Sequence, residues 1–163
     1  MVLRIMSPLY EGCGVWNFTS GGNVGIDRTK PLIELAQPMN VTFYRAFDVT
    51  PNPFKALDEI INLGIERILT AGQKNTGPKG LDLIKQLVDK AGDRIIIMPG
   101  SGINEDDIKK IRDYTCAKEF HLTGRKTIGS KMKYRKDGIF FSRLPQIPEY
   151  EIKITDTKRI EKL

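Results

Sequence analysis

Residues 94–105 decide the fold: Arg94-Ile95-Ile96-Ile97-Met98-Pro99-Gly100-Ser101-Gly102-Ile103-Asn104-Glu105. The short β-branched run predicts a strand buried on both faces, as in parallel sheets. Pro99 and the two glycines predict a turn with left-handed backbone, and Asn104 predicts the cap of a helix with an acidic first turn. A helix that follows a strand and a Gly-x-Gly turn can bind anions through backbone N–H groups. Glycines after a strand are nevertheless more often plain turn residues.

The composition is that of a protein with one sizeable core. The 163 residues, 40% of them hydrophobic, predict a single α/β domain over residues 1–163. Two cysteines, Cys13 and Cys116, are too few for a disulfide framework and favour a reducing compartment. The N-terminal apolar run is too short for a signal peptide, and no stretch could span a membrane. We therefore expect a cytoplasmic protein.

Strands and amphipathic helices alternate along the middle of the chain, which predicts a parallel sheet. A further strand is expected at Cys13–Phe18. Asp27 and Asn52 are expected to cap helices, with Pro53 as the first helical residue of the second. Gly64 and Gly92 are expected to end helices. The strands of the alternating series are predicted at Val41–Ala46, Glu66–Thr70, Arg94–Met98 and Lys118–Leu122.

The pattern changes after residue 123. Residues 125–136 carry much of the net charge of +6 and are expected to form a basic loop. Tyr150–Thr155 alternates like an edge strand, and Asp156 is expected to cap a short helix. The basic run has one interleaved aromatic residue, Tyr134, and no RNA-binding motif, so we expect a solvated or phosphate-facing loop and no nucleic-acid partner.

Five ordered motifs are found at Thr42–Asp48, Arg67–Gln73, Ile95–Asn104, Ala117–His121 and Met132–Arg135. Together they resemble the CutC family, and the resemblance covers about residues 12–163. It implies a (β/α)8 barrel, a role in copper homeostasis and copper as a ligand. Three positions depart from the family pattern: Tyr44 replaces His, Ala71 replaces Ser and Ser101 replaces Gly.

The length predicts a partial TIM barrel. A complete barrel takes roughly 250 residues, and the matching region starts at about the fourth strand of the family barrel. We therefore expect about strands four to eight, without the N-terminal third. Such an open sheet would leave unpaired edges, which predicts a homo-oligomer.

Polar residues gather at the predicted carboxyl ends of the strands, where barrel enzymes bind their substrates. Arg45 is expected to hold an anion, and Asp48 or His121 to act as acid or base. The alternative is that these side chains satisfy hydrogen bonds inside the barrel. Thr70 and Gln73 follow the next strand.

An anion site is predicted beside them. By the family alignment, the Gly100–Asn104 turn follows barrel strand seven and Thr123-Gly124-Arg125 follows strand eight, the usual place of a phosphate site. Gly100, Ser101, Gly102 and Asn104 would contribute the turn, and Thr123 and Arg125 the second loop.

The sequence does not assign metal ligands. His121 is the only histidine, and Cys13 and Cys116 are expected at the opposite end of the barrel from it. Met98 could approach His121, although a core methionine is the more frequent case. Three functions remain open: copper homeostasis with copper binding, a TIM-barrel enzyme acting on a small anionic or phosphorylated metabolite, and a non-catalytic binding module.

Overall fold

The computed structural model describes residues 2–5, 12–15, 17–136, 138–139 and 147–161. The chain divides into two compact units, Met1–Leu122 and Thr123–Leu163, and each is described by itself. Among the described residues, no helix has both the length and the apolar character needed to cross a membrane.

The first unit alternates strands and helices, and the second is a two-stranded ribbon with a short helix. The strands are β1 Val2–Ile5, β2 Gly12–Val15, β3 Asn40–Phe43, β4 Arg67–Thr70, β5 Ile96–Pro99, β6 Glu119–Leu122, β7 Arg125–Gly129 and β8 Glu151–Thr155. The helices are α1 Ile26–Ala36, α2 Pro53–Asn62, α3 Leu81–Ala91, α4 Glu105–Thr115 and α5 Thr157–Ile160, with 3₁₀ turns η1 Arg45–Val49 and η2 Gly77–Lys79.

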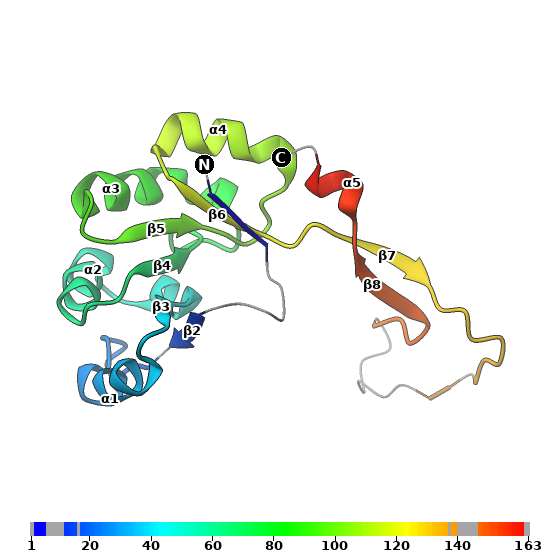
Figure 1. Cartoon of the computed structure of the whole chain (residues 1–163), viewed down its shortest axis with the longest axis horizontal. Helices are drawn as coiled ribbons and strands as arrows, with labels where there is room; N and C mark the ends of the chain where they lie inside the picture. The colour runs from blue at the N-terminus through cyan, green and yellow to red at the C-terminus, as the bar shows by residue number, and fades with distance from the viewer. Residues whose placement is uncertain (1, 6–11, 16, 137, 140–146, 162–163) are drawn as a thin grey trace. The chain divides into compact units, whose positions relative to one another are not determined.

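The central sheet is parallel, as expected, in the order β2-β3-β4-β5 (Figure 1). Phe43 pairs with Ile68, and Ile68 with Ile97. Strand β6 lies next to β5 but pairs in parallel with β1. The carboxyl ends of β3, β4 and β5 therefore meet at one edge, where the candidate site lies.

One face of this sheet forms the main core. Side chains of α1, α2 and α3 pack on Phe43, Ile68 and Ile97. Leu57, Ile84 and Leu87 are fully buried there. Burying the apolar stripe of each helix against the sheet is the main force that holds the layers together.

The stretch at residues 94–105 folds as the sequence predicts, with two differences. Strand β5 begins at Ile96 instead of Arg94, and it includes Pro99 as its last residue instead of ending at Met98. Ile96 N–H and Gly100 N–H donate to carbonyls of the β4 side, at 2.9 Å each. Pro99 therefore faces the side of β6, with which β5 forms no ladder, so its missing N–H costs no hydrogen bond.

Position 100 requires glycine because a side chain there would clash with its neighbours. The left-handed backbone of this turn is found at the two residues that follow. A Cβ at Gly100 would lie 2.5 Å from Leu69 Cδ1 and 3.2 Å from the Cβ of His121. Ser101 and Gly102 have φ of 68° and 65°. A non-glycine residue in this region is strained by roughly 1–3 kcal/mol, and such strain collects at functional sites.

Several local predictions are confirmed. Asn52 caps α2 through its side chain, with Pro53 as first helical residue. Asn104 caps α4 in a capping box with Asp107. Gly64 and Gly92 follow α2 and α3 with positive φ.

Three predicted elements of the first unit are wrong in their bounds. The strand expected at Cys13–Phe18 is β2, Gly12–Val15. Helix α1 is capped by Gly25, with Asp27 inside its first turn and Pro31 inside the helix. Burial of Ile33 and Ala36 offsets the missing N–H of Pro31. The strand predicted to run to Ala46 ends at Phe43, and η1 follows. The last ladder bond is Tyr44 N–H to the Val15 carbonyl.

The second unit also differs from expectation. Arg125–Gly129, predicted as loop, is β7, and it pairs antiparallel with β8. The expected edge strand at Tyr150–Thr155 begins one residue later. Asp156 stands at the cap position of α5 without a side-chain capping bond, because its carboxylate pairs with Lys126 at 3.4 Å.

Replacing Asn104 by Ala is expected to lower the free energy of unfolding by about 1 kcal/mol, because it removes the side-chain oxygen that accepts from the N–H groups of Asp106 and Asp107. Asn104→Ser keeps an N-cap oxygen and is expected to lose a few tenths of a kcal/mol at most. Urea unfolding followed by circular dichroism measures both. Equal loss in the two variants would contradict a capping role.

Candidate functional site

Arg45 and Asp48 form the centre of the site at the carboxyl edge of the sheet. Both belong to η1, and Arg45 Nε donates to Asp48 Oδ2 at 2.9 Å. The Asp48 side chain is 6% exposed and that of Arg45 39%. The pair therefore has a buried carboxylate and an accessible guanidinium.

Asp48 joins η1 to the loop that follows β4. Its carboxylate accepts from the Thr70 hydroxyl at 2.5 Å. It also accepts from the N–H of Ala71 at 2.9 Å and of Gln73 at 3.0 Å. Gln73 has a left-handed backbone, φ 56°, and its amide donates to the Thr50 carbonyl at 2.6 Å. Both carboxylate oxygens are thus engaged inside the protein.

Arg45 joins the same turn to the loop after β5. Nη1 donates to the Ser101 hydroxyl at 2.9 Å, and Nη2 donates to the Lys74 carbonyl at 3.0 Å. Ser101 in turn donates to the carbonyl of Asn75 at 3.0 Å. These contacts use three of the five guanidinium N–H groups, so two stay available for a ligand.

His121 lies against the same turn. Its Nδ1 would be 3.4 Å from a Cβ at Gly100, the residue before Ser101. Nε2 is buried and has no hydrogen-bond partner among the described residues. Burial lowers the pKa of His121 below its ordinary value, against a smaller opposing effect of a hydrogen bond to its own backbone. Arg45 and His121 thus lie beside the Gly100–Ser101 turn, and Asp48 is linked to it through Arg45.

Some backbone N–H groups of the predicted anion site are already hydrogen-bonded within the protein, and others are not. Gly100 N–H donates to the Thr70 carbonyl at 2.9 Å, and Asn104 N–H to Asp107 Oδ2 at 3.1 Å. Within the described part of the chain, the N–H groups of residues 101–103 have no hydrogen-bond partner. Thr123 and Arg125, the other predicted residues, belong to the second unit.

This arrangement suits binding of an anion better than proton transfer by Asp48. A carboxylate that accepts four or more bonds holds neighbouring groups in place and has no free lone pair facing solvent. Asp48 is therefore a positioning residue in this geometry. Arg45 can donate to a ligand, and burial lowers the pKa of His121, whose Nε2 has no hydrogen-bond partner among the described residues.

The cysteines lie where the sequence predicts. Cys13 is in β2, and Cys116 is the left-handed residue that ends α4 just before β6. Cys116 is exposed and free. No group of three or more His, Cys, Asp or Glu residues suited to a metal ion occurs among the described residues.

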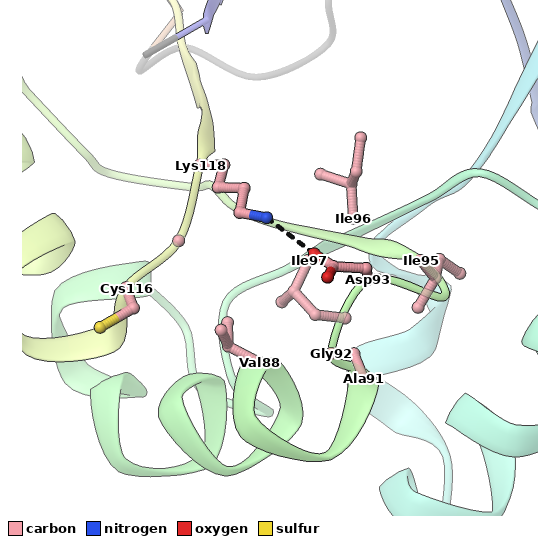
Figure 2. Close-up of a pocket in the computed structure, with 10 residues that line it drawn as sticks. Val88, Ala91, Gly92, Asp93, Ile95, Ile96, Ile97, Cys116 and Lys118 are labelled. Atoms are coloured by element: carbon pink, nitrogen blue, oxygen red, sulfur yellow. Dashed lines mark hydrogen bonds and ion pairs between the residues drawn. The ribbon is translucent and has the colours of Figure 1, made fainter.

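A cavity of about 230 Å³ opens at the opposite end of the strands (Figure 2). Its walls are apolar and include Val88, Ile95 and Ile97. Lys118 and Asp93 pair across it at 2.9 Å, and the sulfur of Cys116 points away from that pair (Figure 2). This cavity is distinct from the Arg45 site.

Sequence reasoning missed two features. The carbonyls of Lys74 and Asn75 hold Arg45 and Ser101, and no residue-type signal predicts a carbonyl contact. Arg67 and Glu119 form a buried ion pair at 2.8 Å, each side chain 7% exposed. Charged residues inside two short apolar strands are a signal that could have revealed this pair.

The fold is that of an α/β protein with a parallel sheet, and the candidate site lies at the carboxyl ends of its strands. The sequence profile of the CutC family matches residues 10–126. The chain belongs to the CutC family.

Its relatives include a CutC family protein of Parabacteroides distasonis, 43% identical over 88% of this chain and 59% of the relative. A copper homeostasis protein cutC homolog of Mus musculus is 37% identical over 97% of this chain and 59% of the relative. The chain thus spans about three fifths of the length of these relatives.

A similar solved structure is the crystal structure of the putative copper homeostasis protein CutC from Streptococcus agalactiae. The TM-score is 0.63 at 30% identity, over 66% of this chain and 53% of that protein. The sequence-based assignment to this family is confirmed.

The single histidine allows a direct test of the buried imidazole. Burial lowers the folded-state pKa of His121 below 6.5, so the imidazole of the unfolded chain takes up a proton at a higher pH than that of the folded chain. The contribution of the neutral ring to the free energy of unfolding is therefore fully present above pH 6.5 and is lost as the pH falls through the folded-state pKa. We expect the imidazole resonance to titrate below pH 6.5 by NMR.

The unfolding free energy of His121→Gln is expected to change less than that of the parent between about pH 5 and 8. Identical pH profiles of the two proteins, or a midpoint at the value of a free histidine, would contradict the burial of this ring.

Proposed function

We propose that this chain takes part in copper homeostasis, with copper ion as its cargo, in the cytoplasm. Membership of the CutC family carries the proposal, because relatives bear the name copper homeostasis protein. Since the chain spans about three fifths of those relatives, the role of the whole protein remains part of the proposal.

The described donors do not fit a closed copper site within one chain. Cu(I) prefers thiolate and thioether ligands. Cys116 lies before β6, while His121 lies near the carboxyl end of that strand. Met98 is buried in β5. Copper binding by this chain would therefore draw on donors from more than one molecule.

We infer that β3, β4, β5 and β6 are consecutive strands of a partial (β/α)8 barrel. Their parallel pairing or adjacency and the intervening helices support this inference, as does the match to part of a CutC crystal structure. In such a barrel, ligands bind at the carboxyl ends of the strands, where Arg45 and Ser101 meet.

A second candidate function is the binding of a small anionic or phosphorylated metabolite. Arg45 is held by three protein contacts and is partly exposed. The N–H groups of residues 101–103 are available beside it, and α4 begins immediately after them. Guanidinium and backbone N–H donors suit a tetrahedral oxyanion.

This second function has a catalytic and a non-catalytic form. As an enzyme, the chain would use Arg45 to hold the anion and His121 as acid or base, with Asp48 positioning Arg45. As a binding module it would take the same anion without turnover. Assays with phosphorylated metabolites separate the two.

Copper binding is expected to be weak and to depend on protein concentration, because the donors of one chain do not converge. Anaerobic Cu(I) titration against a competing chelator, at several protein concentrations, measures this. Cys116→Ser and Cys13→Ser report on the two thiols separately. A tight site with one copper per chain, unchanged by dilution, would be the contrary result.

Phosphate or sulfate is expected to shift the amide resonances of residues 101–103 in an NMR titration. Arg45→Gln is expected to weaken this binding roughly tenfold or more, the effect of losing a charge-assisted hydrogen bond. Arg94→Gln is the matched control, because Arg94 bonds carbonyls at the C-terminal end of α3. Equal affinity of the two variants, or shifts confined to other residues, would exclude the proposed anion site.

A further inference from the structure

The β7–β8 ribbon has an exposed surface that no described residue of its own unit covers. All residues of β7 and most of β8 are exposed. Ile128 and Ile152 pair directly across the ribbon, so they share one face, and they are 37% and 47% exposed. An isolated two-stranded ribbon is marginally stable in water. Additional strands would therefore stabilise it.

The hydrogen bonds at the two ends of the ribbon identify its free edges. Ser130 N–H donates to the Tyr150 carbonyl at 2.7 Å, and Asp156 N–H to the Gly124 carbonyl at 2.8 Å. Backbone groups alternate along a strand, so those of Ile152 and Ile154 also face β7. The N–H and C=O groups of Glu151, Lys153 and Thr155 face the other edge, where no described strand pairs with them.

The two edges differ in charge. The β7 edge carries Arg125 and Lys126 and no acidic residue, so it offers no cross-strand ion pair to an identical edge. The β8 edge carries Glu151 and Lys153, which have opposite charges and form no ion pair among the described residues. Only the β8 edge is complementary to itself.

We propose that the free edge of β8 pairs antiparallel with β8 of a second copy of this chain, about a two-fold axis at Ile152. Glu151 then lies opposite Lys153 of the second copy, and Lys153 opposite its Glu151. Both are residues whose backbone groups face this edge, so the register satisfies backbone bonds and side-chain charges together.

The same register extends the apolar face. Ile152 meets its own equivalent, and Tyr150 lies opposite Ile154 of the second copy. The two nearest alternatives, axes at Glu151 and at Lys153, would each set a charged residue against its own equivalent, which is unfavourable. The product is a four-stranded antiparallel sheet, closed by two-fold symmetry. Because one short strand edge is a small interface, the dimer is weak and dissociates on dilution.

Charge reversal with the full chain tests this pairing. Glu151→Lys sets Lys against Lys twice, and Lys153→Glu sets Glu against Glu twice. Each is expected to weaken dimerisation roughly tenfold in sedimentation equilibrium, since two cross-strand pairs change sign. An equimolar mixture of the two variants restores both attractive pairs, so it is expected to form heterodimers as tightly as the parent dimerises.

Matched controls are Glu34→Lys in α1 and Lys109→Glu in α4, which are exposed and outside the ribbon. They are expected to leave dimerisation unchanged. Mixing cannot rescue a variant whose ribbon fails to fold, so restoration in the mixture separates pairing from misfolding. A chain that stays monomeric, single variants that dimerise like the parent, or a mixture no tighter than its components would each overturn the proposal.

A crosslink tests the register. In a Cys116→Ser background, Ile152→Cys places two thiols in a non-hydrogen-bonded pair, whose Cα atoms lie about 4.5 Å apart, within disulfide range. Oxidation is expected to give a covalent dimer. Thr127→Cys, on the far strand, is expected to give none. Equal crosslinking of the two variants would exclude the Ile152 axis.

Discussion

The Asp48 carboxylate is the interaction on which the candidate site depends. It accepts from the backbone of residues 71 and 73, from the Thr70 hydroxyl and from Arg45, so one buried group holds η1 and the loop after β4 together. Arg45 then reaches Ser101 in the loop after β5. A carboxylate that is removed from water to this degree must accept hydrogen bonds from several donors. Three successive strand ends are thereby fixed in one geometry.

The strand ends also explain why two non-glycine residues, Gln73 and Ser101, keep a left-handed backbone. Each is bonded to one member of the Arg45–Asp48 pair. These bonds offset the conformational cost, and the loops keep an orientation in which the N–H groups of residues 101–103 stay available. Rigid positioning of donors before a ligand arrives lowers the entropy cost of binding it.

Charge is unevenly distributed between the two units. Residues 123–163 contain eleven Lys and Arg against five Asp and Glu, while residues 1–122 contain fifteen of each. The whole net charge of +6 therefore belongs to the second unit. Repulsion between the second units of two copies disfavours nonspecific association, whereas the alternating charges of β8 favour one register of pairing. Charge of this kind governs specificity more than affinity.

The sequence by itself determined the features that depend on neighbouring residues. Asn52 and Asn104 cap the helices that follow them, Gly64 ends a helix, and the alternation of strands and helices predicts the parallel sheet. The family motifs also identified the family. The tertiary structure alone decided where β3 ends, that Asp48 binds the loop after β4, and that Arg125–Gly129 becomes a strand beside β8. These features rest on hydrogen bonds between residues more than twenty positions apart, and local propensity carries no information about such partners.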